Sequence, residues 1–142
     1  MDIKVERVDY LNQEQGKEIG FLLNAYAGDL MGGGKPLADG VIENIATELS
    51  KIPHAFSVIA YMDGQPAGLV NCFEGFSTFS CKPLINIHDM IVLKEFRGHR
   101  LGKRMLEKVE ENKKEWEEKT GLYLLTSDMN GMSVVIMEND EE

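Results

Sequence analysis

The sequence is organised around residues 86–106, where an apolar strand pattern runs through a short, basic, glycine-containing turn into an amphipathic helix pattern. The first backbone N–H groups of a helix lack partners within the helix, and the helix dipole adds partial positive charge at the same end. A phosphate group is a natural ligand for such a turn. Five basic side chains add to the local positive charge: Arg97, His99, Arg100, Lys103 and Arg104. The stretch therefore predicts an anion-binding site.

The length and composition predict an ordinary globular domain. The 142 residues are enough for one domain with a core and too few for two, so a single domain over residues 1–142 is expected. The hydrophobic share of 43% and the charged share of 27% are typical of a soluble protein. No apolar run approaches the roughly 20 residues of a membrane-spanning helix. The N-terminal residues lack the order of a signal peptide, which predicts no membrane association and a cytoplasmic location.

The net charge of −9 disfavours nucleic acid as a partner, because non-specific affinity for nucleic acid comes largely from neutralised phosphates. The basic residues at 97–104 are a local exception that fits a small anion in a defined pocket. The two cysteines, Cys72 and Cys81, have neither C-x-x-C spacing nor a His-rich neighbourhood. They are predicted to be reduced, buried thiols, and no metal site is expected.

The periodicity of the first half predicts its elements. Residues 3–8 alternate with a period of two and predict an edge strand. Asn12 and Gln15 form a capping-box pattern before a first amphipathic helix, and Asp39 is the expected N-cap of a second. Asp-Gly at 63–64 lies between two apolar runs, which is the strongest short-range signal of a β-hairpin.

The apolar run at 84–93 contains a break in phase. Ile85 and Ile87 set an inward phase that would next fall on Asp89, yet the apolar residues resume at Met90. One extra residue near positions 88–89 repairs the phase. A β-bulge or local splay is therefore predicted there, a feature that is over-represented beside active sites.

The second half predicts a strand–helix–strand unit. The helix that follows the basic turn is expected to end at Gly121, and residues 122–126 to form a strand parallel to 84–93. Residues 132–137 predict one short strand that covers the sheet or pairs with another subunit. The apolar face of the helix is expected to be buried; it consists of Leu101, Met105, Leu106, Val109 and Trp116.

Two well-known phosphate-binding patterns do not fit the basic turn. A Walker A loop has four residues between its glycines and a Ser or Thr after its Lys, whereas Gly98 and Gly102 have three residues between them. Arg104 stands where the Ser or Thr would bind magnesium. The dinucleotide pattern G-x-G-x-x-G is absent as well.

The turn resembles another motif. Arg97-Gly98-His99-Arg100-Leu101-Gly102 is similar to R/Q-x-x-G-x-G/A, the acetyl-CoA-binding motif of the GNAT superfamily of N-acetyltransferases. Arg100 occupies the first glycine position, and the neighbouring Gly98 is expected to supply the backbone freedom instead. With the element order around it, the resemblance covers roughly residues 3–127. It implies a mixed α/β fold, with a mostly antiparallel central sheet that is flanked by helices and splayed at its fourth strand.

The resemblance also implies which residues bind acetyl-CoA in that splay. Backbone groups of Met90, Ile91 and Val92 would pair with the pantetheine arm as an added strand does. The side chains of Arg97 and Arg100 would add ionic contacts. The pyrophosphate would be held by the turn at Gly98 and by the backbone N–H groups of His99, Arg100, Leu101, Gly102 and Lys103.

The reaction that the resemblance implies is direct attack of an amine on the thioester within a ternary complex. An amine is mostly protonated at pH 7, so a nearby group must accept its proton, directly or through water. Asp89 is the first candidate and His88 the second, because both lie at the predicted bulge. Two structural interpretations stay open: Asp89 only caps the free backbone donors of the bulge, and His88 is only packed.

Residues 128–142 are atypical of the family. GNAT chains usually continue with an Asn, a short helix whose Tyr protonates the leaving thiolate, and two more strands. Here no tyrosine follows Asn130, and the nearest one before it is Tyr123. The shortened pattern favours a homodimer and weakens the expectation of efficient turnover.

Three hypotheses follow. The leading one is an N-acetyltransferase that transfers an acetyl group from acetyl-CoA to a primary amine of a small molecule or to a peptide amino group. The alternative is a catalytically weak or inactive GNAT-fold module that binds acyl-CoA as a sensor. The third is a protein whose basic turn binds another phosphorylated ligand, such as a nucleotide.

Overall fold

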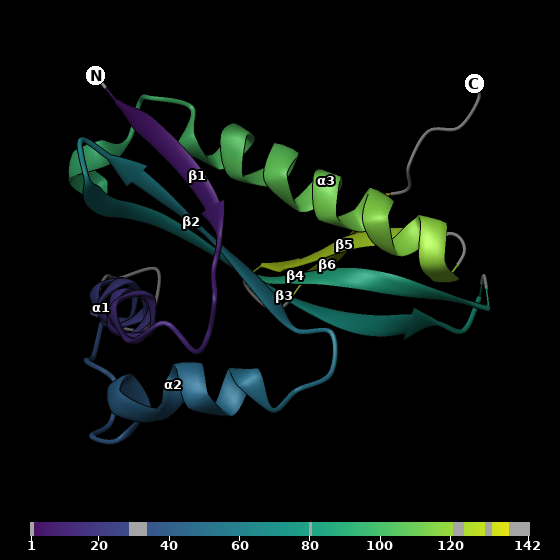
Figure 1. Ribbon diagram of the computed structural model, residues 1–142, viewed down its shortest axis with the longest axis horizontal. Coiled ribbons are helices and arrows are strands. Elements are labelled where there is room, and N and C mark those ends of the chain that lie inside the picture. The colour runs from purple at the N-terminus through teal and green to yellow at the C-terminus, as the bar shows by residue number, and fades with distance from the viewer. Residues whose placement is uncertain (1, 29–33, 80, 121–123, 130–131, 137–142) are drawn as a thin grey trace.

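A computed structural model describes residues 2–28, 34–79, 81–120, 124–129 and 132–136, with side chains as far as Lys114 except those of Lys82 and Lys113 (Figure 1). The elements of these residues are β1 (Ile3–Arg7), α1 (Gln13–Ala27), α2 (Val41–Ser50), β2 (Phe56–Met62), β3 (Gln65–Ser77), β4 (Lys82–Val92), the 3-10 turn η2 (Lys94–Phe96), α3 (Leu101–Thr120), β5 (Leu124–Met129) and β6 (Met132–Ile136). Gly121, Tyr123, Asn130 and the side chain of Trp116, on which several expectations rest, lie outside this description.

The described strands form one sheet in the order β1-β2-β3-β4-β5-β6. Neighbouring strands are antiparallel except β4 and β5, which run parallel as predicted. Helices α1 and α2 cover one face of the sheet and α3 covers the other (Figure 1). The mixed, mostly antiparallel sheet flanked by helices is thus confirmed, as is the edge position of β1. Residues 132–136 pair with β5 of the same chain.

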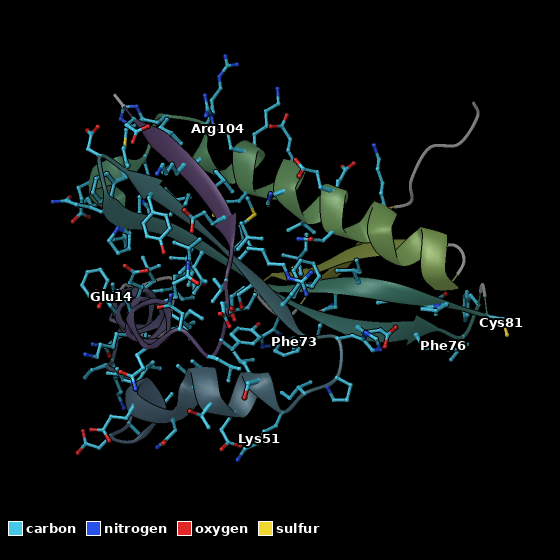
Figure 2. The ribbon with its side chains drawn as sticks, viewed as in Figure 1. Glu14, Lys51, Phe73, Phe76, Cys81 and Arg104 are labelled. Atoms are coloured by element: carbon cyan, nitrogen blue, oxygen red, sulfur yellow. The ribbon has the colours of Figure 1, made fainter. Side chains whose placement is uncertain are left out.

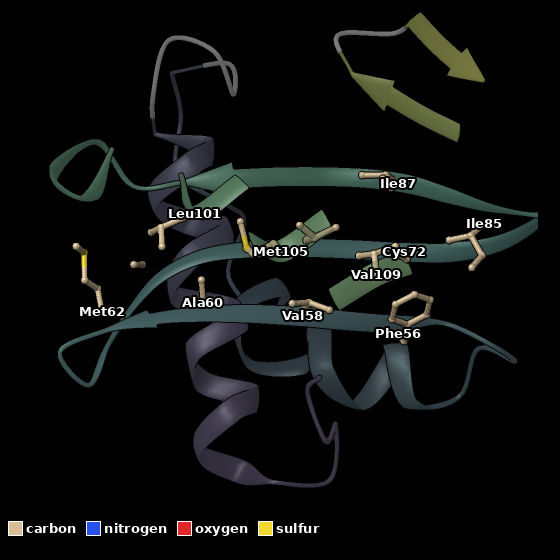
Figure 3. Close-up of a cluster of buried hydrophobic side chains, with 12 residues drawn as sticks. Phe56, Val58, Ala60, Met62, Cys72, Ile85, Ile87, Leu101, Met105 and Val109 are labelled. Atoms are coloured by element: carbon tan, nitrogen blue, oxygen red, sulfur yellow. The ribbon is translucent and has the colours of Figure 1, made fainter. Parts of the chain in front are cut away.

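Each face of the sheet carries a hydrophobic cluster. On the α3 side, side chains of α3 pack on residues of β2, β3 and β4 and form what we call the α3 cluster (Figure 3). Its buried residues are Phe56, Val58, Ala60, Met62, Ala67, Val70, Cys72, Ile85, Ile87, Leu101, Met105 and Val109. On the α1 side, Ile19 and Leu22 pack on Ile59, Leu69 and Ile91. Each Leu or Ile that is fully buried in this way contributes about 1.5–3 kcal/mol relative to an exposed side chain. The two clusters hold the three central strands between the helix layers.

The predicted β-bulge is confirmed. Asn71 of β3 pairs with Asp89 and Cys72 with Ile87, so His88 is the extra residue on β4. Because side chains alternate along a strand, this one residue inverts the phase of β4. Ile87 lies in the α3 cluster, whereas Ile91 lies in the α1 cluster.

The turn and cap signals were mostly right. Asn12 caps α1 and accepts a hydrogen bond from the backbone N–H of Gln15 at 3.0 Å. The β2–β3 turn has positive φ at both Asp63 (51°) and Gly64 (83°), the geometry that favours Asp-Gly. The predicted N-cap Asp39 was wrong. The chain enters α2 through Gly40 at φ 91°, a left-handed conformation that glycine adopts without steric cost, so the cap falls one residue later.

One cysteine prediction was also wrong. Cys72 is buried in the α3 cluster as expected, but Cys81 is exposed. Figure 2 shows Cys81 and Phe76 at the far end of the β3–β4 hairpin, which extends beyond the helices. The apolar pattern of the segment could not show that the β3–β4 hairpin extends beyond the helices that cover the rest of the sheet. None of the described helices is long and apolar enough to cross a membrane.

Candidate active site

The sheet opens between β4 and β5, and the predicted site residues gather beside this opening. Among the described residues, β4 pairs with β5 only from Leu84 to Ile87. From Asp89 to Val92, β4 keeps its antiparallel partner β3 but has no partner on the β5 side of the described chain. The predicted splay at the fourth strand is therefore present. An unpaired strand edge can bind an extended chain through backbone hydrogen bonds.

The residues predicted to pair with the pantetheine arm form the second half of β4. Met90 and Val92 are half-buried against the α3 cluster, and Ile91 is buried on the α1 side. Their side chains therefore pack on both faces of the sheet, which leaves the backbone at the open edge. One carbonyl of this segment is already engaged, because Arg97 Nε donates to the Val92 oxygen at 3.2 Å.

The basic turn leads from this edge into α3. The backbone N–H of Arg104 donates to the Arg100 carbonyl at 3.1 Å, which begins the hydrogen-bond series of the helix. The N–H groups of Leu101, Gly102 and Lys103 have no earlier carbonyl in that series. The first turn of α3 carries no acidic residue, and Arg104 projects away from the sheet (Figure 2). Basic side chains at a helix N-terminus oppose the dipole, and a bound anion would remove that conflict.

The backbone of the turn shows how it departs from the glycine motif. Arg100, at the first glycine position, has φ 60°, and Gly98 has φ 91°. A non-glycine residue in this left-handed region costs about 1–2 kcal/mol, so the turn keeps a glycine-like conformation with an arginine in it. Nothing lies within 4 Å of a Cβ built on Gly98. A Cβ on Gly102 would lie 2.7 Å from Met90 Cε, which reflects the close packing of α3 on β4.

These features fit a phosphorylated cofactor with an extended arm. The exposed side chains of Arg97, Arg100 and Lys103 surround the turn, and Leu101 is buried with only its backbone available. His99 and Gly102 are half-buried beside them. The structure thus brings the predicted phosphate-binding residues into one turn at the end of the open strand edge.

Asp89 lies at the bulge with its side chain on the α1 side. Asn71 Nδ2 donates to Asp89 Oδ2 at 3.0 Å, and the Asp89 side chain is half-buried. Burial raises the pKa of the neighbouring Cys72 thiol, and the Asp89 charge raises that pKa further. The thiol is therefore neutral, which leaves Asp89 and His88 as the candidate proton acceptors at the bulge. His88 is exposed, and its ring packs edge-on against Phe73 with the centroids 5.4 Å apart.

Sequence analysis missed the polar residues behind Asp89. Ser57 and Asn71 are 0% and 3% exposed, each within an otherwise apolar strand. Isolated polar residues in buried strands were the signal that could have found them, because a buried polar group requires a partner. Among the described residues, no group of three His, Cys, Asp or Glu side chains could hold a metal ion.

Solved structures share this architecture. A GNAT family acetyltransferase from Staphylococcus aureus superposes over 100% of this chain and 98% of its own, with a TM-score of 0.67 and 16% identity. An aminoglycoside N-acetyltransferase in complex with CoA superposes over 91% of this chain and 78% of its own, with a TM-score of 0.66 and 18% identity. The fold and the opening at β4 place the chain in the class of GNAT-fold proteins.

The sequence comparisons specify the family. The model of the acetyltransferase (GNAT) family matches residues 37–134, more than half of the chain. An uncharacterized N-acetyltransferase from Archaeoglobus fulgidus is 40% identical over 52 residues, which is 36% of this chain and 35% of that protein. The chain belongs to the acetyltransferase (GNAT) family.

Proposed function

We propose that this chain transfers an acetyl group from acetyl-CoA to a primary amine of a small molecule or to a peptide amino group. The observation that carries the proposal is the open edge of β4, with the Asp89 carboxylate at one end and the basic turn at the other. In acetyl-CoA the thioester is followed by the long pantetheine arm and then by the pyrophosphate. The Asp89 carboxylate, the open β4 edge and the basic turn follow one another in the same order.

The backbone of Met90, Ile91 and Val92 would hold the arm, and the N–H groups of His99 to Lys103 would hold the pyrophosphate. Arg97 and Arg100 would add ionic contacts, which are stronger than hydrogen bonds between neutral groups. Acetyl-CoA supplies an acetyl group already activated as a thioester.

Asp89 would accept the proton that the amine loses as its nitrogen bonds to the acetyl carbon. The carbon–sulfur bond of the thioester breaks at the same carbon, and the CoA thiolate that leaves takes a proton from water. The products are an N-acetyl amine and CoA. Because the basic turn leads into α3 while Asp89 faces α1, we expect the acceptor to approach from the α1 side. A cleft of about 670 Å³ lies between α1 and α2 on that side, with Tyr10 in its wall.

The test is calorimetric titration of the chain with acetyl-CoA, desulfo-CoA and ATP, with release of the CoA thiol followed over polyamines, amino acids, aminoglycosides and peptides. We expect acetyl-CoA to bind and ATP not to compete, and we expect charge reversal of Arg97 and Arg100 to abolish binding. Thiol release with one acceptor class identifies the substrate. Absence of acetyl-CoA binding would overturn the proposal.

A second candidate is an acyl-CoA sensor of the same fold without turnover. It is favoured by one observation: residues 124–142 contain no tyrosine that could protonate the leaving thiolate. Tight binding of acetyl-CoA with no thiol release over the whole acceptor panel is the outcome that selects this function.

We also propose that residues 1–142 form a single domain that works in the cytoplasm as a homodimer. One sheet that extends from residue 3 to residue 136 supports the single domain. β6, the last strand of the described sheet, offers an edge that a second copy can extend. Light scattering coupled to size exclusion tests the dimer.

A further inference from the structure

A row of polar side chains crosses the three central strands on the α1 face and ends at Asp89. Ser57 of β2 pairs with Asn71 of β3, which in turn pairs with Asp89 of β4. Ser57 Oγ donates to Asn71 Oδ1 at 2.6 Å, and Asn71 Nδ2 donates to Asp89 Oδ2 at 3.0 Å. At the other end, the Tyr10 hydroxyl lies 2.7 Å from Ser57 Oγ. The row thus joins the cleft between α1 and α2 to the bulge.

The direction of each bond follows from the donors that each group has. Ser57 has one hydroxyl proton, which it gives to Asn71, so Tyr10 must donate to Ser57. The Asn71 Nδ2 group can only donate, so Asp89 must accept. Hydrogen bonds that donate to a carboxylate favour its charged form over its protonated form.

The fold keeps this row polar at an energetic cost. The adjacent row on the same face is apolar and consists of Ile59, Leu69 and Ile91, all at most 2% exposed. Burying a hydroxyl or an amide without a partner costs about 1–3 kcal/mol, so Ser57 and Asn71 persist only because they satisfy one another and Asp89. The bulge at His88 completes the arrangement, because without it Asp89 would face α3.

We propose that Asn71, supported by Ser57 and Tyr10, is the positioning residue that holds the Asp89 carboxylate charged and in one orientation for accepting the proton of the amine. The inference rests on the proposed function, in which Asp89 has that role. The positioning itself is a property of the protein alone and can be measured without an acceptor.

Several titratable or charged groups surround this row. Cys72 lies on β3 beside Asn71, and its thiol is neutral because burial raises its pKa. Burial raises the pKa of Tyr10 to about 12, against smaller lowering effects of the hydrogen bond with Ser57 and of the charge of Arg7 on β1. His88 adjoins Asp89 in sequence and packs on Phe73. The pH profiles of kcat described next are therefore also recorded with His88→Asn present, which removes the imidazole.

The first test compares Asn71→Leu with Tyr61→Phe. Asn71→Leu removes the donor to Asp89 at similar volume. Tyr61→Phe is the matched control, because Tyr61 lies on the same face of β2 but its hydroxyl contacts Glu18 and Gln15. The assay uses the acceptor that the thiol-release panel identifies. We expect Asn71→Leu to lower kcat about tenfold or more and to leave the KM for acetyl-CoA within about twofold of its original value. In the plot of kcat against pH, the loss of activity at low pH should begin at a higher pH in this variant.

Tyr10→Phe should produce the same changes at smaller size, and Tyr61→Phe should produce neither. Two results would show that Asn71 is merely structural and would overturn the proposal. One is a lower kcat in Asn71→Leu with an unchanged pH profile; the other is a Tyr61→Phe variant that shows the same two changes as Asn71→Leu. Ser57→Ala, which removes one hydroxyl from the row, replaces Asn71→Leu should the latter fail to fold.

The second test is carbon-13 NMR of the aspartate carboxyl groups at neutral pH, with the Asp89 signal assigned from Asp89→Asn. We expect the Asp89 carboxyl signal to shift in Asn71→Leu, because the hydrogen bond from Asn71 is lost, and to stay unchanged in Tyr61→Phe. An unchanged Asp89 signal in Asn71→Leu overturns the positioning role whatever the activity. A shifted signal in a protein that acetylates no amine supports the positioning of Asp89 and counts against the proposed function alone.

Discussion

The two halves of β4 are adjacent in one strand but differ in what surrounds them. Up to Ile87, β4 has strands on both sides, and Ile85 and Ile87 are buried in the α3 cluster. From Asp89 onward, the described chain gives it a partner on the β3 side only, and Asp89 faces α1 with a hydrogen bond from Asn71. The first half is enclosed within the sheet, whereas the second half has an open backbone edge beside the Asp89 carboxylate.

The difference teaches that the surroundings of one strand can change at a single bulge. His88 inverts the side-chain alternation, and the divergence of β5 after Ser127 leaves the backbone edge open. Neither change requires a different kind of strand sequence. Variants on each side of the bulge therefore test the comparison directly.

Ile87→Asp should have the largest effect. Ile87 is buried in the α3 cluster, so the new carboxylate would lie there as an unpaired charge. Such a charge typically costs about 3–5 kcal/mol, which we expect to see in the free energy of unfolding by urea. His88→Asp is the matched control, because His88 is exposed at the bulge; it should cost at most about 1 kcal/mol, the value of a ring contact such as that with Phe73. Equal losses would contradict the difference in surroundings between the two halves of β4.

Asp89→Asn and Ile87→Ala should separate the two halves. We expect Asp89→Asn to lower turnover by about 10²–10⁴-fold with acetyl-CoA binding and stability nearly unchanged, because an amide still accepts from Asn71 but takes up no proton. Ile87→Ala should lower the free energy of unfolding by about 2–5 kcal/mol through the cavity it leaves, with kcat of the folded protein nearly unchanged. Calorimetry, urea unfolding and thiol release measure the three quantities. A stability loss in Asp89→Asn as large as that in Ile87→Ala would erase the distinction.

Arg100→Gly should sharpen the comparison at the end of the open edge. A glycine relieves the left-handed strain at φ 60° and should raise the free energy of unfolding by about 1 kcal/mol, or the Tm by about 2–4 °C. Arg100→Ala is the matched control, because it removes the same charge but keeps a Cβ. Both variants should weaken acetyl-CoA binding, and only Arg100→Gly should gain stability. A gain in both would show that charge repulsion, and not backbone strain, is relieved.

An effect confined to high pH is expected at Tyr10. The pKa of Tyr10 is raised from its usual value of 10.0 to about 12 by burial, so the folded state holds this proton more tightly than the unfolded state. The stabilisation is complete below pH 10 and is lost as the pH rises from about 10 to about 12. Tyr10→Phe should flatten the fall in unfolding free energy over that window by up to about 1.4 kcal/mol per pH unit. Identical slopes in the two proteins would contradict the burial of this hydroxyl.

The local elements were predictable because their signals are local. Residues 3–8, the Asn12 cap and the hairpin turn at 63–64 follow from spacings of two to four residues, which set strand alternation, capping and turn geometry. The bulge was predictable for the same reason, since a break in alternation is visible within residues 84–93. The exposed Cys81 and the Gly40 cap were not, because they depend on where the sheet ends and how the chain enters α2.

By itself, the sequence determined the order of the elements, the extra residue in β4 and the basic turn before α3. These are properties of neighbouring residues, for which periodicity and charge are sufficient evidence. Only the tertiary structure decided that Asn71 hydrogen-bonds to Asp89, and that Ser57 and Tyr10 extend this row of hydrogen bonds. The physical reason is that strand pairing brings together residues 14 to 47 positions apart, and the register of that pairing is a property of the whole sheet.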